Sequence, residues 1–121
     1  MPSGVAVIGQ PLWAAVGYSL PALLGTLLAA PRRRQLLFIG DGAFQMTAQE
    51  LSTILRRCLK PIIFLVNNNG YTIERLILGP GSGYNDINQW RYADTQDQAI
   101  AYRVRNEDEL EDALAARKHS C

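Results

Sequence analysis

The stretch QLLFIGDG, residues 35–42, decides the fold, because a short apolar run stops abruptly at glycine. A second run, IIFLV at residues 62–66, stops at asparagine in the same way. Short apolar runs of this kind are typical of parallel strands that are buried on both faces. We therefore expect two neighbouring parallel strands with both faces of the sheet covered.

A helix is predicted between these runs, over residues 43–59, which contain neither glycine nor proline. Arg56 and Arg57 near its end favour a helix, because cations stabilise the carboxyl end of the helix dipole. A strand, a helix and a strand in this order predict a right-handed connection and an α/β fold. Four apolar residues are predicted to share the core-facing side of this helix: Phe44, Leu51, Ile54 and Leu55.

Polar residues follow both strands directly. Asp41 follows the first strand and Asn68 follows the second, so parallel pairing would bring both to one edge of the sheet. A carboxylate, an amide oxygen and a nearby carbonyl suit Mg²⁺, and free amides of Gly42 and Ala43 would meet phosphate oxygens. Either GDG or NNNG alone is more often a turn. Their joint occurrence at two strand ends predicts a site for a metal and a diphosphate.

The GDG at 40–42, the asparagines at 67–68 and GYTIER at 70–75 resemble the signature of thiamine diphosphate enzymes, within them the indolepyruvate, phenylpyruvate and pyruvate decarboxylases. QPLW at 10–13, QMTAQEL at 45–51 and YNDI at 84–87 extend this resemblance to residues 9–90. The resemblance implies an incomplete three-layer α/β fold, with a mostly parallel sheet flanked by helices. It also implies thiamine diphosphate and Mg²⁺ as cofactors.

The resemblance assigns roles to individual residues. It implies that side-chain oxygens of Asp41 and Asn68, and the carbonyl of Gly70, bind Mg²⁺. Relatives of this type hold the cofactor's pyrimidine through the carbonyl at Ala14 and support its bend with the side chain at Val16, where they more often carry glycine and isoleucine. Three residues would lie along the diphosphate: Gly42, Ala43 (often serine in relatives) and Ile73.

Glu74 is the expected catalytic residue, since the family uses the matching glutamate on the substrate carboxylate and on the intermediate left after CO₂ departs. Proton transfer by a carboxylate at neutral pH needs an apolar environment, which nearby side chains are expected to provide. Position alone favours an exposed glutamate paired with Arg75 or with solvent, and the surrounding YTIE reverses this preference. The expected apolar neighbours are Tyr71, Ile73, Leu76 and Ile77.

The length of 121 residues predicts one domain, whereas complete enzymes of the family have three. We expect residues 1–121 to form one partial cofactor-binding domain. The family's activating glutamate and a histidine pair come from a separate N-terminal domain, usually on a neighbouring subunit. The isolated chain is therefore expected to be inactive, and the complete enzyme to be a homo-oligomer, a dimer or a tetramer. The only histidine, His119, is expected to be solvated.

The carboxyl-terminal part is predicted to add a strand at residues 102–105 and a helix at residues 107–117. Three side chains of this helix are expected to face inward: Leu110, Ala113 and Leu114. The segment GPGSG at 79–83 follows a predicted helix rather than a strand, so a mobile loop near the site is favoured over a phosphate loop.

The amino-terminal part has two interpretations. Residues 2–31 carry no charge, and residues 12–30 are long enough to cross a bilayer before three arginines. Gln10, Pro21, abundant glycine and alanine, and the lack of a basic start oppose membrane insertion. We favour a helix buried between the sheet and a partner subunit.

Composition excludes some function classes. With 12 basic and 11 acidic residues, the chain lacks the charge expected for binding nucleic acid or an anionic membrane. Cys58 and Cys121 lack metal-ligand spacing and are typical of a reducing cytoplasm. No GxGxxG follows the first strand, which excludes a classical dinucleotide site.

The sequence therefore leaves three possible functions. The first is the cofactor domain of a decarboxylase for 2-oxo acids such as indolepyruvate, phenylpyruvate, branched-chain acids or pyruvate. The second is a related enzyme of the acetolactate synthase or benzoylformate decarboxylase type. The third is a catalytically inert fragment.

Overall fold

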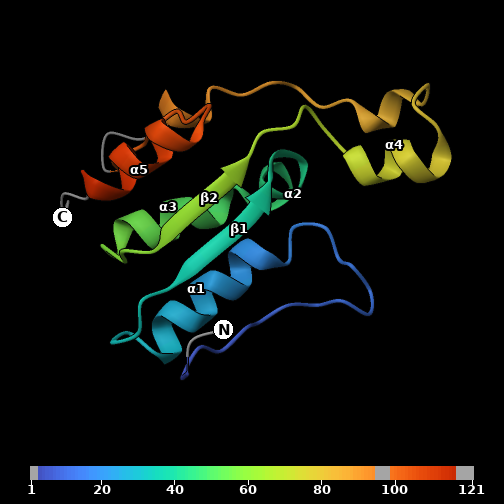
Figure 1. Cartoon of the computed structure of the whole chain (residues 1–121). Helices are drawn as coiled ribbons and strands as arrows, with labels where there is room; N and C mark the ends of the chain where they lie inside the picture. Colours follow the sequence, from blue (N-terminus) through green and yellow to red (C-terminus); the bar gives the residue numbers. More distant parts are fainter. Residues whose placement is uncertain (1–2, 95–98, 117–121) are drawn as a thin grey trace. The chain divides into compact units, whose positions relative to one another are not determined.

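The computed structural model describes residues 3–94 and 99–116. The chain forms two compact units, Met1–Asn88 and Gln89–Cys121, and each is described by itself (Figure 1). The predicted single domain stays a prediction. The first unit contains α1 (Ser19–Ala29), β1 (Leu36–Gly40), α2 (Asp41–Thr47), α3 (Gln49–Arg56), β2 (Ile62–Val66), α4 (Thr72–Leu78) and the 3₁₀ turn η1 (Gly83–Asn85). The second contains the 3₁₀ turn η2 (Tyr92–Asp94) and α5 (Glu107–Ala115).

The two predicted strands form a parallel pair. Their register runs from Leu36 opposite Ile62 to Gly40 opposite Val66. Both strands therefore end at the same edge of the sheet, and the segments that follow them start side by side. This confirms the α/β class with a parallel sheet and helices against it.

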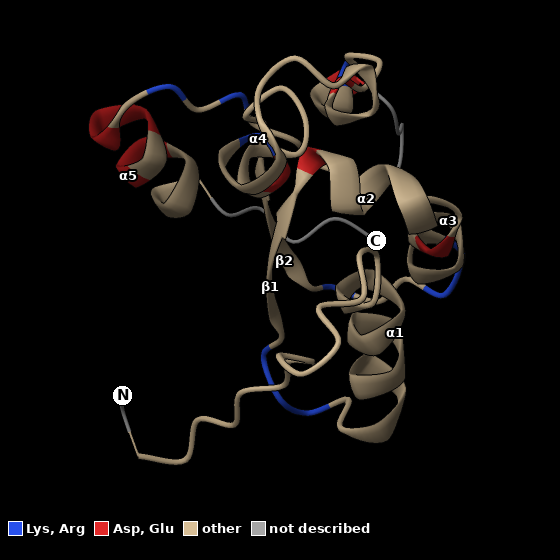
Figure 2. Ribbon diagram, turned by 90° about the vertical axis from the view of Figure 1, so that its right-hand side faces the viewer, with Lys and Arg blue, Asp and Glu red and all other residues tan. Residues whose placement is uncertain are grey.

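The sheet of the first unit is covered on one side. Figure 2 shows α1, α2 and α3 on the same side of the two strands. Leu37 and Ile39 of β1 are buried there, whereas Phe38 on the other face is 68% exposed and stacks on Phe64 with ring centroids 4.7 Å apart. The expectation of burial on both faces is wrong for β1 within this unit, because its three covering helices all pack on one face.

The amino-terminal helix α1 supplies a large part of the core. It begins at Ser19 and buries Leu20, Leu23 and Leu27, whose spacing puts them on one helical face. This face packs against β1, α2 and α3. Among the described residues, no helix is long and apolar enough to cross a membrane.

The helix predicted over residues 43–59 is divided in two. It begins earlier, at Asp41, is interrupted at Ala48, and ends at Arg56. No glycine or proline marks the interruption, and Ala48 keeps helical dihedral angles, so no local sequence signal predicted it. Phe44 and Ile54 are buried as predicted, while the other two apolar residues, Leu51 and Leu55, are half-buried.

The second unit differs from its prediction. Residues 102–105 have no regular structure and are exposed, because a strand needs a hydrogen-bonded neighbour and none pairs with them in the described part of the chain. Of the three side chains of α5 expected to face inward, Ala113 is half-buried, and Leu110 and Leu114 are 36% and 37% exposed, so their burial within this unit is only partial. Residues 117–121, with His119 and Cys121, lie outside the described residues.

A side-chain cap that the sequence analysis missed starts α5. Asn106 accepts a hydrogen bond from the Glu109 amide at 2.9 Å, and Glu109 Oε2 accepts one from the Arg105 amide at 2.7 Å. The Asn-x-x-Glu spacing is the signal that could have located this helix start.

Candidate cofactor-binding site

Asp41 forms the centre of the candidate site. It follows β1 directly, begins α2, and is only 1% exposed. Its Oδ1 accepts a hydrogen bond from the Gly42 amide at 2.8 Å, and its Oδ2 accepts one from the Gly70 amide at 3.1 Å. An ionised carboxylate has about four acceptor positions, so each oxygen keeps one position for a further ligand. The two amides fix this carboxylate in orientation.

Asn68 faces this carboxylate. One terminal atom of its amide group lies 3.0 Å from the Gly70 carbonyl oxygen and 3.1 Å from Asp41 Oδ1, and the other lies 2.9 Å from the Thr72 hydroxyl. When the nitrogen faces Asp41, it donates to both oxygens. When the oxygen faces Asp41, three oxygens meet without a proton, an arrangement that a cation stabilises. Adjacent ligands of octahedral Mg²⁺, each about 2.1 Å from the ion, are about 3 Å apart.

The turn before α4 requires glycine at position 70. Gly70 has φ of 116°, and a Cβ added there would lie 2.2 Å from the carbonyl oxygen of Asn85. The preceding residue, Asn69, also has positive φ, which asparagine tolerates better than most residues. This close packing turns the chain so that the Gly70 amide reaches Asp41 and its carbonyl faces Asn68.

The residues expected along the diphosphate agree only in part with the sequence-based expectation. The Gly42 amide is bonded to Asp41, so the expectation of a free amide there is wrong: the carboxylate beside it takes its hydrogen. A Cβ at Gly42 would lie 2.6 Å from the ring of Tyr71, so these two segments pack closely. Ala43 is half-buried in α2, and Ile73 is exposed on the first turn of α4.

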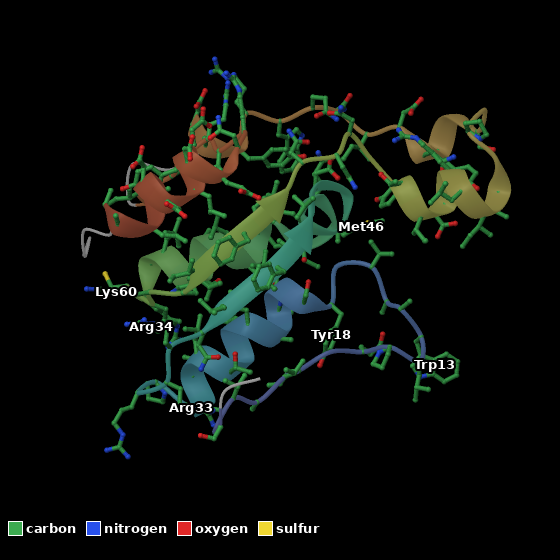
Figure 3. All side chains as sticks on the ribbon, viewed as in Figure 1. Trp13, Tyr18, Arg33, Arg34, Met46 and Lys60 are labelled. Atoms are coloured by element: carbon green, nitrogen blue, oxygen red, sulfur yellow. The ribbon has the colours of Figure 1, made fainter. Side chains whose placement is uncertain are left out.

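The segment expected at the pyrimidine is anchored to α2. Gly17 is buried, and a Cβ there would lie 2.9 Å from the Cβ of Met46. The Thr47 hydroxyl donates to the Gly17 carbonyl at 2.9 Å, a contact that the sequence analysis missed because no local pattern links residues 30 positions apart. Ala14 has φ of 45° and Val16 is half-exposed. The same segment carries Trp13 and Tyr18, and Figure 3 shows Trp13 projecting outward.

Glu74 lies in the first turn of α4 and is half-buried. Its neighbour Arg75 forms an ion pair with Asp86 at 2.8 Å, so the alternative of a pair between Glu74 and Arg75 is not what the structure shows. The apolar enclosure expected around Glu74 is absent from the described part of the first unit, because Leu76 and Ile77 point to solvent.

The donor set fits a hard cation. Within residues 3–94 and 99–116, no group of three or more His, Cys, Asp or Glu side chains is arranged so that it could hold a metal ion. A metal here would therefore rely on one carboxylate and two neutral donors, an amide oxygen and a backbone carbonyl. Mg²⁺ is commonly bound through one or two carboxylates, with water and phosphate oxygens completing its ligands. Asp41, Asn68 and Gly70 are the predicted metal-binding residues that the structure brings together.

Comparison with known proteins finds relatives that carry the same name, alpha-keto-acid decarboxylase. The alpha-keto-acid decarboxylase of Mycolicibacterium paratuberculosis strain K-10 is 50% identical over 125 residues, covering 98% of this chain and 22% of that protein. The alpha-keto-acid decarboxylase of Mycobacterium ulcerans strain Agy99 is 50% identical over 121 residues, covering 96% and 21%. That of Mycobacterium tuberculosis strain H37Rv is 47% identical over 126 residues, covering 98% and 22%. The chain thus spans about a fifth of the length of these relatives.

The family model described as "Thiamine pyrophosphate enzyme, C-terminal TPP binding domain" matches residues 3–120. This match covers nearly the whole chain and includes both strand ends and the turn at Gly70. The chain therefore belongs to the thiamine pyrophosphate enzymes, as their C-terminal cofactor-binding domain.

Proposed function

We propose that this chain is the cofactor-binding part of a thiamine diphosphate and Mg²⁺ dependent enzyme that decarboxylates 2-oxo acids to aldehydes without oxidation. One observation carries the proposal: at the shared edge of β1 and β2, one terminal atom of the Asn68 side-chain amide lies 3.1 Å from Asp41 Oδ1 and 3.0 Å from the Gly70 carbonyl oxygen. The names of the three relatives reported above, each an alpha-keto-acid decarboxylase, favour this reaction over that of an acetolactate synthase or benzoylformate decarboxylase.

The residues of the chain have separate tasks in this proposal. Bound thiamine diphosphate supplies the electron sink for the carbanion that remains when CO₂ leaves. Asp41, Asn68 and Gly70 hold Mg²⁺, which offsets the charge of the diphosphate, and Glu74 moves a proton at its carboxylate oxygens. Gly42, Ala43 and Ile73 lie along the diphosphate, while Ala14 and Val16 support the pyrimidine.

The substrate class is a small 2-oxo acid with an aromatic, branched or methyl side chain, such as indolepyruvate, phenylpyruvate or pyruvate. The resemblance in residues 70–75 and 84–87 supports this class. The complete enzyme is a cytoplasmic homo-oligomer in this proposal, and a partner chain or another domain supplies the remaining catalytic groups. The isolated chain binds cofactor without turnover in this proposal.

Calorimetric titration of thiamine diphosphate into the full 121-residue chain, with and without Mg²⁺, tests the proposal. We expect binding that requires Mg²⁺ and that weakens by about tenfold or more, at least 1.4 kcal/mol, in Asp41→Ala. Asp112→Ala on the exposed face of α5 is the matched control and should bind like the wild type. A folded wild-type chain that binds no cofactor, or an Asp41→Ala chain that binds equally well, would instead indicate an inert fragment.

A further inference from the structure

The guanidinium group of Arg75 joins three segments of the first unit. Its Nη2 donates to the carbonyl of Asn69 at 2.7 Å, to the carbonyl of Asn85 at 3.2 Å and to the carboxylate of Asp86 at 2.8 Å. These acceptors lie before α4 and after it, whereas Arg75 lies within it. The side chain of Arg75 is 26% exposed, so it is largely enclosed by the groups that it binds.

These contacts surround the metal-binding turn. The carbonyl of Asn69 belongs to the peptide that immediately precedes Gly70. On the other side of Gly70, the Tyr71 amide donates to the Asn85 carbonyl at 3.1 Å. That same carbonyl oxygen lies only 2.2 Å from the position that a Cβ on Gly70 would take. Arg75 therefore binds the carbonyl on the amino-terminal side of Gly70, that of Asn69. It also binds the Asn85 carbonyl, which accepts the hydrogen bond from the Tyr71 amide on the carboxyl-terminal side.

Asn85 makes the second support rigid. It is completely buried, and its Nδ2 donates to the Gly79 carbonyl at 3.2 Å, which closes the loop between α4 and η1. Arg75 attaches this closed loop to the turn at Gly70. Since Gly70 in turn donates its amide to Asp41, a continuous set of hydrogen bonds connects Asp86 to the carboxylate at the centre of the site.

The hydrogen bonds to the backbone carbonyls are expected to stabilise the turn more than the ion pair with Asp86 does. The Asp86 side chain is 76% exposed, and an ion pair with an exposed partner contributes only about 0.2–1 kcal/mol. The carbonyl of Asn85 instead receives a charged donor in a partly buried setting, and the exposed carbonyl of Asn69 receives the same donor at 2.7 Å. Hydrogen bonds from a charged donor are stronger than neutral ones. All three bonds come from the one nitrogen Nη2, whose two hydrogens are shared among three acceptors. A lysine ammonium lies one bond closer to the backbone than this nitrogen, so it does not reach the same position between the three acceptors.

We propose that Arg75 is a positioning residue of the metal site: it fixes the turn at residues 69–70 so that the Gly70 amide reaches Asp41 and the Gly70 carbonyl faces the side-chain amide of Asn68. The proposal rests on the proposed function, because it assumes that Asp41, Asn68 and the Gly70 carbonyl hold a cation. Arg75 contacts none of the three proposed ligand atoms. Its removal lowers the affinity for the cation by letting the turn move, without removing a ligand.

Mn²⁺ binding to the full chain tests this inference, with the free-ion signal in electron paramagnetic resonance as the readout in the presence of thiamine diphosphate. Arg75→Met is expected to weaken Mn²⁺ binding by about 10- to 100-fold, the range seen when groups that support metal ligands are removed. Arg75→Lys should bind with intermediate affinity, and Asp86→Asn should lose less than Arg75→Met because both carbonyl contacts remain. Arg91→Met removes the comparable pair with Asp94 in the second unit and is the control.

Thermal unfolding without metal separates positioning from general stability. If Arg75→Met keeps the wild-type midpoint and loses Mn²⁺ affinity, the inference holds. If it keeps both, the inference is wrong while the proposed function stands. Should Arg75→Met fail to fold, Arg75→Lys decides: wild-type affinity in a folded Lys variant overturns the inference, and weakened affinity supports it. A folded wild-type chain that binds no Mn²⁺ overturns the proposed function itself.

Discussion

Gly42 lies against the ring of Tyr71, and this contact predicts an unusual response to alanine. Glycine to alanine inside a helix normally stabilises by about 1 kcal/mol. At position 42 the new Cβ would lie 2.6 Å from the ring, so the ring must move and its packing is lost. We expect Gly42→Ala to lower the free energy of unfolding by about 1–3 kcal/mol, measured by urea denaturation.

A second background tests the cause of that loss. In Tyr71→Ala the ring is gone, so Gly42→Ala should there raise the free energy of unfolding by about 1 kcal/mol. Gly40→Ala is the neighbouring control, because a Cβ at Gly40 meets nothing within 4 Å. If Gly42→Ala destabilised both backgrounds equally, the ring contact would not be its cause.

Single residues also show how far the sequence could predict the site. Asp41 and Asn68 were placed at one sheet edge correctly, because each follows an apolar run and parallel strands end together. The Arg75 contacts were missed, since they join residues 6 to 11 positions apart across a loop that has no periodic pattern. The bond from the Gly42 amide to Asp41 was also missed, because the choice between phosphate and carboxylate as its acceptor depends on side-chain rotation.

At the scale of elements, the end of α3 offers a test of capping. Cys58 adopts φ of 50° just after the helix, and the Leu59 amide donates to the Ile54 carbonyl at 3.0 Å, as in a helix end that favours glycine. Cys58→Gly should therefore raise the free energy of unfolding by about 0.5–1 kcal/mol, measured by thermal and urea denaturation. Cys58→Ala keeps the strained φ and should bring no gain. Equal effects of glycine and alanine would show that loss of the thiol matters instead.

Elements were predicted well where burial decides them. The strands at residues 36–40 and 62–66 matched their apolar runs within one residue, because the two runs pair with each other and α2 packs against both. The strand predicted at residues 102–105 was wrong, since a β-branched and aromatic pattern alone provides no hydrogen-bonding neighbour. The interruption at Ala48 could not be predicted from the sequence. Neither proline nor glycine occurs there, and alanine favours a helix as its neighbours do.

At the scale of the whole molecule, the exposed apolar surface of the first unit predicts self-association. Large exposed apolar patches mark association sites, and burial of each Å² contributes about 25 cal/mol. The most exposed large apolar side chains of this unit are Val7, Leu12, Trp13, Phe38, Leu76 and Ile77.

We expect sedimentation velocity of the 121-residue chain to show species larger than a monomer that grow with concentration. The double variant Leu76→Gln and Ile77→Gln removes two of these side chains from α4 and should shift the distribution toward monomer. Ile100→Gln, at a less exposed apolar position of the second unit, is the control and should leave the distribution unchanged. A monodisperse wild-type monomer that melts cooperatively would contradict the expectation, because burial of these side chains between copies would then contribute too little to offset the entropy of association.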